Sequence, residues 1–248
     1  MKKTLSLKPV LSSVVFIFSL LSVGQSQASL IYSETFESDG LGSRYSAAGA
    51  GNGGGGCCQV WQLNSLDGGN ESDVLVGFEG NDFWAASDLN DSNLPSGFSA
   101  TTPRSLILNN IDVSNYMNLQ VDVMLAGSQN HESSDFFRVF ILDNDSNTKT
   151  ILEEFTSPAN SSPLTGSVSN SNLGLTFSNF NYLLSNGFSN VSIGFEAWNT
   201  ANNEVLGIDN IRVSGDQQRV GNVPEPSMLG LLGIGLFMGM LGRRRSKK

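Results

Sequence analysis

Short apolar runs separated by turn residues recur along the middle of the chain, and they constrain its fold more than any other feature. The clearest run, residues 118–126, reads NLQVDVMLA and carries an apolar residue at nearly every second position. This alternation places apolar side chains on one face of a β-strand. Helical periodicity is scarce in the same region. The sequence therefore predicts an all-β fold, specifically an antiparallel jelly-roll-like β-sandwich.

The candidate strands are short, rich in β-branched or aromatic residues, and flanked by Gly, Asn, Asp or Ser. They cover residues 30–36, 73–79, 104–113, 118–126, 136–142, 149–155, 175–184, 190–198 and 205–213. No helical crossover separates them, so neighbouring strands are expected to pair antiparallel. Residues 29–215 suffice for one β-sandwich domain with a hydrophobic core.

The start of the chain has the composition of a secretory signal peptide. Lysines precede an uncharged apolar stretch, residues 10–23, and small residues follow at positions 26–28, which read SQA. This layout predicts a signal peptide over residues 1–28, with cleavage between Ala28 and Ser29. The alternative is an uncleaved N-terminal anchor. With cleavage, the domain is exported.

The end of the chain combines a proline-bracketed motif, an apolar stretch and a basic terminus. A linker over residues 216–226 ends in the motif Val223-Pro224-Glu225-Pro226, and residues 227–248 form an apolar tail that closes in RRRSKK. The apolar part is shorter than the ~20 residues that a membrane-spanning helix needs. It predicts a short hydrophobic helix. Basic residues at both ends of the chain favour the cytoplasmic side, which places the domain outside the inner membrane.

In order and spacing, this tail resembles the PEP-CTERM sorting signal of Gram-negative bacteria. The resemblance implies that an exosortase-type enzyme recognises the Pro-Glu-Pro motif and cleaves near it. It also implies that the tail holds the precursor in the inner membrane transiently. The mature protein is then expected at the cell surface or in the extracellular matrix, alongside exopolysaccharide.

The charge balance excludes nucleic acid as a partner. Of the 14 Lys and Arg residues, three precede Ser29 and five follow Gly242, which leaves six against 23 Asp and Glu and a net charge of −17 between them. Such a surface repels phosphate backbones. The acids are scattered, which is also typical of an ordinary soluble surface.

The last candidate strand carries an acid among apolar residues. If residues 205–213 form a regular strand, Asp209 shares a face with Val205, Ile211 and Val213. A buried carboxylate is costly unless a cation or hydrogen bonds compensate for it. Asp209 is therefore expected either to bind a cation or to accept backbone N–H bonds at a strand edge.

The body of the chain resembles carbohydrate-binding-module-like jelly rolls. In that group an early Phe-Glu pair and an Asp in the last strand often share a structural calcium ion. The matching residues here are Phe36-Glu37 and Asp209. The resemblance implies a calcium site formed by Glu37, Asp39 and Asp209, since calcium prefers several carboxylate oxygens.

Aromatic residues suggest a polysaccharide-binding surface. In residues 190–198, alternation directs Glu196 and Trp198 away from the core. An exposed indole stacks on a sugar ring while polar side chains bind its hydroxyl groups. We therefore expect Trp198, Glu196 and Asn199 to contact extracellular polysaccharide. The alternative is that a loop covers Trp198.

The chain's two cysteines, Cys57 and Cys58, are adjacent and follow a glycine run. In an oxidising compartment they are expected to form a disulfide. An intramolecular bond between neighbours is strained, because their Cα atoms lie only ~3.8 Å apart. The alternative is an intermolecular pair.

No pattern in the sequence selects a catalytic site. The single histidine, His131, stands in a polar loop and is expected to be solvated, and the sequence contains neither G-x-S-x-G nor H-E-x-x-H. We therefore predict a non-enzymatic surface or matrix protein. The alternatives are a structural matrix protein with no specific ligand and a glycan-degrading enzyme.

Overall fold

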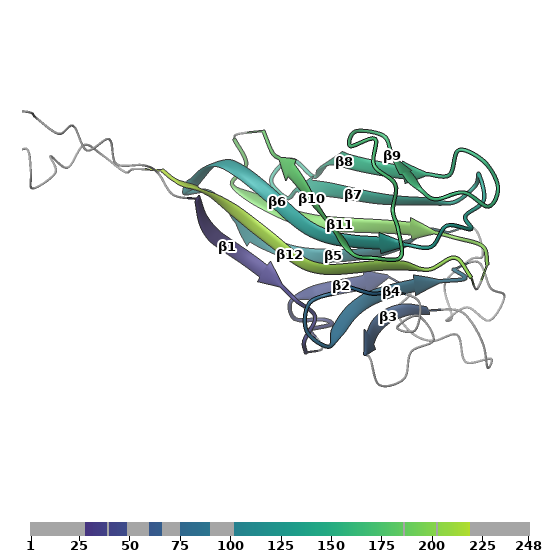
Figure 1. Cartoon of the computed structure of the whole chain (residues 1–248). Helices are drawn as coiled ribbons and strands as arrows, with labels where there is room; N and C mark the ends of the chain where they lie inside the picture. The colour runs from purple at the N-terminus through teal and green to yellow at the C-terminus, as the bar shows by residue number, and fades with distance from the viewer. Residues whose placement is uncertain are drawn as a thin grey trace, which may run out of the picture.

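The computed structural model describes residues 28–38, 40–48, 60–65, 75–89, 102–185, 187–201 and 203–218. Within these ranges the chain forms two six-stranded sheets packed face to face, with antiparallel pairing between strands (Figure 1). The predicted all-β sandwich is confirmed. The predicted signal peptide, apart from Ala28, and the predicted C-terminal helix lie outside the described residues. The described part contains no helix that could cross a membrane.

The first sheet has the strand order β10-β6-β12-β4-β3, and β1 also pairs with β12. Its strands are β1 (Ala28–Glu34), β3 (Val60–Ser65), β4 (Asp82–Ser87), β6 (Tyr116–Gly127), β10 (Ser178–Leu183) and β12 (Leu206–Gln217). The second sheet has the order β2-β5-β11-β7-β8-β9. Its strands are β2 (Tyr45–Ala48), β5 (Arg104–Asp112), β7 (Phe136–Asp143), β8 (Thr148–Thr156), β9 (Thr165–Gly166) and β11 (Asn190–Trp198).

An aromatic cluster fills the space between the two sheets. Trp84 makes edge-to-face contacts with Tyr45 and Trp61, each at a centroid separation of 5.5 Å. Phe36 packs on Tyr45 at 5.6 Å. Such pairs add about 0.5–1.5 kcal/mol each beyond the area they bury. Trp61 and Trp84 are 1% and 2% exposed, so both are core residues and neither reaches a ligand.

A second apolar layer covers the outer face of the first sheet. The rings of Phe78, Phe83 and Phe177 pack there in tilted and edge-to-face contacts, with the centroids of Phe83 and Phe177 5.3 Å apart. The predicted strand at residues 73–79 is wrong: within its described part, residues 75–79, a single bridge from Val76 to Thr176 replaces a ladder. Leu75 and Phe78 of this segment pack onto the sheet, whereas Val76 is exposed.

Strand β12 changes its neighbour halfway along one edge. Residues 206–208 pair with β4, and residues 211–216 pair with β1. The ladder with β6 shifts register between Asp209 and Arg212, and Asn210 has a positive φ of 46°. This β-bulge inserts one residue and reverses the alternation after it. The expectation that Asp209 shares a face with Ile211 and Val213 is therefore wrong.

Candidate functional site

Strand β11 presents Glu196 and Trp198 on the outer face of the second sheet. Val191, Ile193, Phe195 and Ala197 are buried on its core side, whereas Glu196 and Trp198 are half-buried. The register places Trp198 opposite Phe136 at the start of β7, and Phe136 is half-buried too. Two neighbouring aromatic side chains therefore lie at one end of this face. We call Phe136, Arg138, Glu196 and Trp198 the outer aromatic face.

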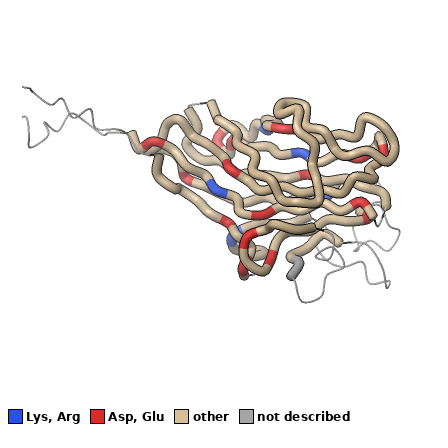
Figure 2. Tube along the Cα trace, viewed as in Figure 1, with Lys and Arg blue, Asp and Glu red and all other residues tan. Residues whose placement is uncertain are grey.

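Charged side chains border these rings and are paired with one another. The Arg138 guanidinium lies over the Phe136 ring at 4.1 Å and forms an ion pair with Glu154 at 2.6 Å. Glu196 pairs with Lys149 at 2.5 Å and with Arg138 at 3.7 Å. The face is thus locally close to neutral. Elsewhere, acids are spread over the sandwich with few basic residues among them (Figure 2).

Asn199 does not belong to this face, which corrects the sequence prediction for that residue. Its side chain is completely buried. Its Oδ1 accepts the Leu89 N–H at 3.0 Å, and its Nδ2 donates to the carbonyl oxygen of Glu204. The residue therefore holds two loops together and has no amide group free for a sugar hydroxyl.

The structure brings Glu37 and Asp209 to one turn, residues 79–82, where β12 changes neighbour. The N–H of Glu79 donates to Asp209 Oδ2 at 2.8 Å, and the N–H of Asn81 donates to Glu37 Oε1 at 2.9 Å. The φ of Gly80 is +77°, a conformation that favours glycine, and a Cβ atom there would displace the Glu37 carboxylate, whose Oε1 would lie 1.9 Å away. Asp39, the third predicted calcium ligand, lies outside the described residues.

Asp209 is a buried carboxylate, as the sequence suggested, although it lies on the outer face of the sheet. It is 0% exposed and accepts N–H bonds from Glu79 and from Asn210, the latter at 2.7 Å. Burial raises its pKa to about 6, and the charges of Glu79 and Glu37 act in the same direction against the two hydrogen bonds. No ion pair to Asp209 from a Lys or Arg is found among the described residues.

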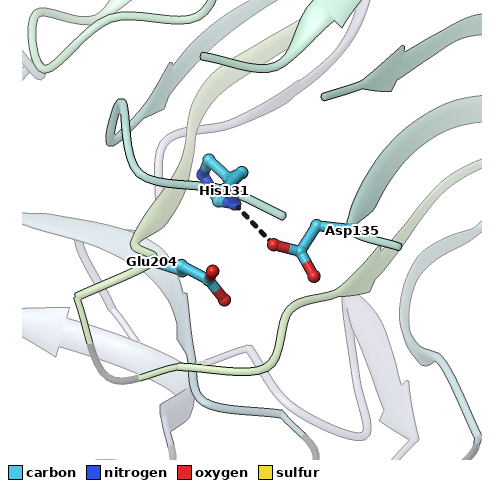
Figure 3. Close-up of side chains that lie close together, drawn as sticks. All are labelled: His131, Asp135 and Glu204. Carbon is cyan, nitrogen blue, oxygen red and sulfur yellow. Dashed lines mark ion pairs between the residues drawn. The ribbon is translucent and has the colours of Figure 1, made fainter. Parts of the chain in front are cut away.

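Sequence reasoning missed a buried polar cluster formed by His131, Asp135 and Glu204 (Figure 3). The expectation that His131 is solvated is wrong, because the residue is 0% exposed. Burial, followed by the hydrogen bond to Glu132, raises the pKa of Glu204 to about 8. Each residue offers one potential metal-ligand atom, and these three atoms lie within 4.8 Å of one another. In the part of the chain that the structure describes, no other group of three such residues comes this close. A lone loop histidine gives no signal for it, since Glu204 is distant in sequence.

The remaining predicted sites fall at or beyond the edges of the described chain. Cys57 and Cys58 and the Val223–Pro226 motif lie outside the described residues. Ala28 and Ser29, the predicted cleavage boundary, open β1, where they pair with Asp216 and Gly215 of β12. Strand β12 continues to Gln217, two residues past the predicted domain end.

The C-terminal tail matches a known motif. Residues 222–246 match the PEP-CTERM protein-sorting motif. This indicates an exported protein whose precursor is anchored in the membrane and processed by an exosortase. No curated protein matches the chain at the sequence level.

Comparison with solved structures finds distant similarities. The chain is 18% identical to the K2 cleaved adhesin domain of Lys-gingipain, covering 73% of this chain and 96% of that one, with a TM-score of 0.44. It is 12% identical to the K3 domain from Porphyromonas gingivalis W83, covering 76% of this chain and 99% of that one, with a TM-score of 0.47. It is 12% identical to the C-terminal family 22 carbohydrate-binding module of Clostridium thermocellum Xyn10B, covering 77% of this chain and 96% of that one, with a TM-score of 0.39. Similarity at this level assigns no ligand to this chain.

Proposed function

We propose that this protein is a non-enzymatic component of the cell surface or extracellular matrix of a Gram-negative bacterium, and that it binds polysaccharide through the outer aromatic face. The observation that supports this most directly is the pairing of half-buried Trp198 with half-buried Phe136 at one end of the outer face of the second sheet. Aromatic planes stack on the C–H faces of sugar rings, and adjacent charged groups bind hydroxyls.

A neutral polysaccharide suits this face better than an anionic one. Arg138 and Lys149 are already paired with Glu154 and Glu196, so they offer no spare positive charge. The chain as a whole carries a formal net charge of −9, which opposes the approach of an acidic polymer. The hydroxyl groups of a neutral polymer can still bond to these charged side chains.

Binding of the full-length protein, kept soluble in detergent, to immobilised polysaccharides tests the proposal. The panel should contain a neutral β-glucan, a xylan and a mannan, with an alginate as the anionic comparison. For the polymer that binds, Trp198→Ala should weaken binding about thirtyfold, the effect of removing a central aromatic contact worth ~2 kcal/mol.

The matched control is Leu183→Ala. Leu183 is 75% exposed on β10, in the other sheet, and its truncation should leave binding unchanged. Absence of binding to every polymer would favour a structural matrix protein with no specific ligand. Turnover of a polymer would instead favour a glycan-degrading enzyme.

Calcium is the structural cofactor that we propose for the turn at residues 79–82. Glu37 and Asp209 are both hydrogen-bonded to this turn, Glu79 lies beside them, and Asp209 is buried without a cation. Carboxylate oxygens gathered in this way fit the ligand preference of calcium. Glu37, Asp39 and Asp209 would supply the anionic ligands, and the ion would neutralise their charges.

A further inference from the structure

We propose that His131, Asp135 and Glu204 bind a divalent transition-metal ion, represented by Zn²⁺. The three side chains come from two separate loops: His131 and Asp135 lie between β6 and β7, and Glu204 lies between β11 and β12. Their ligand atoms lie within 4.8 Å of one another, and all three residues are buried (Figure 3). The argument for this site does not depend on the polysaccharide proposal or on the calcium proposal.

His131 is fixed in a position that leaves one ring nitrogen facing the acids. Its backbone forms both hydrogen bonds of a bridge with Ser162, at 3.2 and 3.3 Å. Its Nε2 lies 3.3 Å from Ser128 Oγ. With Nε2–H donating to that hydroxyl, Nδ1 presents its lone pair toward Asp135 Oδ2, 3.4 Å away. Histidines that bind metals are usually oriented by such a hydrogen bond on the other nitrogen.

Each of the two acids uses one oxygen for the fold and leaves the other without a partner. Asp135 Oδ2 accepts the Glu132 N–H at 2.8 Å, whereas Asp135 Oδ1 is buried with no hydrogen bond. Glu204 Oε2 accepts the N–H groups of Thr200 and Ala201, both at 2.7 Å, whereas Glu204 Oε1 is buried with no hydrogen bond. A buried acceptor without a donor costs about 1–3 kcal/mol, and more when it is charged.

Three unpaired acceptor atoms, His131 Nδ1, Asp135 Oδ1 and Glu204 Oε1, are therefore buried close together without a cation between them. Among the described residues, no Lys or Arg forms an ion pair with Asp135 or Glu204. The competing occupant is a proton on Glu204, which that residue would share with the half-buried Glu132 beside it. A metal ion would satisfy the imidazole and both carboxylates at once.

The donor set identifies the kind of metal. Calcium and magnesium prefer ligand sets made entirely of oxygen, whereas an imidazole nitrogen with two carboxylates suits zinc and its transition-metal neighbours. Zinc accepts four ligands, and the half-buried Glu132 or a water molecule can supply the fourth. Because the three ligands are buried, the ion would be structural and would tie the two loops together.

The test uses the imidazole of His131, which is the chain's single histidine and therefore gives one set of histidine signals in NMR. Full-length ¹⁵N-labelled protein in detergent is stripped with a chelator, dialysed and titrated with Zn²⁺. Cys57→Ser and Cys58→Ser are introduced so that thiolates do not compete. We expect the imidazole signals to shift and saturate at one equivalent, with the larger change at Nδ1. Imidazole signals that do not move in excess zinc would overturn the proposal.

A pair of matched variants provides a second readout. Glu204→Gln keeps the shape of the side chain and removes its charge, and should weaken zinc binding at least about tenfold. Asp145→Asn, which removes an exposed acid from the hairpin between β7 and β8, should leave zinc affinity unchanged. Unchanged affinity in a folded Glu204→Gln variant would contradict the proposal. If that variant does not fold, the titration of the otherwise unchanged chain still decides the question.

Discussion

Trp198 and Phe136 lie directly opposite each other on β11 and β7, and each stands next to a residue that anchors a loop. Asp135 precedes Phe136, and Asn199 follows Trp198. The two aromatic side chains are therefore positioned by the same buried contacts that hold the loops at this end of the sandwich. Changes in those loops should be felt at the outer aromatic face.

Truncation of Phe136 should weaken polysaccharide binding. We expect Phe136→Ala to reduce affinity about tenfold, equivalent to ~1.4 kcal/mol, because it removes an aromatic plane and the support for the Arg138 guanidinium. Retention on the polysaccharide that binds the unchanged protein measures this. Leu183→Ala again serves as the control. Equal retention of Phe136→Ala and the unchanged chain would limit the binding surface to Trp198.

Calcium should stabilise the chain through Asp209. A ligand that binds only the folded state stabilises it by about 2.7 kcal/mol at a hundredfold excess over Kd. Millimolar calcium should therefore raise the Tm of the full-length protein, and Asp209→Asn should remove most of that rise. Asp145→Asn, at an exposed hairpin position, should keep it. The calcium proposal fails if the Tm is the same in calcium and in chelator.

In the presence of a chelator, the stability of the chain should fall as the pH rises from about 4 to about 6. The pKa of Asp209 is about 6 in the folded chain, against an ordinary value of 3.8. Between these values the folded state retains a proton that the unfolded state has released. The free energy of unfolding is therefore highest at the lower pH and falls as the pH rises to the folded pKa. Up to about 3 kcal/mol is involved at 1.36 kcal/mol per pH unit. Urea unfolding followed by tryptophan fluorescence measures it. Asp209→Asn should reduce the slope and leave the part that comes from Glu204, whose pKa is also raised.

Gly194 should tolerate no side chain. A Cβ atom there would lie 2.0 Å from the Phe140 ring. Gly194→Ala should therefore reduce the free energy of unfolding by about 1–3 kcal/mol, since the ring must leave its packed position. Gly174→Ala is the matched control, because a Cβ atom at that position would meet no other atom within 4 Å. It should change stability by less than about 0.5 kcal/mol.

Mass spectrometry of protein recovered from its producing cells checks the processing and the cysteines together. We expect a chain that begins near Ser29, lacks the segment after the Pro-Glu-Pro motif, and is lighter by two hydrogens than its reduced form. The last result would indicate a Cys57–Cys58 ring. A disulfide-linked dimer would indicate the intermolecular pair, and a retained arginine-rich end would argue against cleavage.

Alternation in the sequence located most of the strands, because one face of each packs on the core. It missed β2, β3, β4 and β9. In β4 the residues after Asp82 are buried throughout, so that no period of two appears. It also misplaced Asp209, since the bulge at Asn210 inserts a residue that alternation does not reveal. Local pattern describes a strand and its two faces, but not an interruption within it.

The candidate site residues were predictable only where the alternation within a single strand determines which way a side chain faces. Glu196 and Trp198 face outward as alternation indicates. Asn199, next in sequence, turns inward because it bonds to Leu89 and Glu204 across the loops. The His131 cluster depends on Glu204 reaching it from another loop, which one sequence without its tertiary contacts cannot indicate.

The pairing of β1 with β12 places both termini of the domain at the same end of the sandwich. Ala28 pairs with Asp216, so both ends of the described chain leave the sandwich at one pole (Figure 1). The loops with His131 and Glu204 lie beyond the other ends of β6 and β12. The 12 residues of β12 place the poles roughly 40 Å apart. Trp198 and the His131 cluster therefore lie at the pole opposite the one from which the tail leaves. A force applied through that tail would act first on the Ala28–Asp216 pair at the end of the β1–β12 ladder, and would separate the two strands one residue pair at a time.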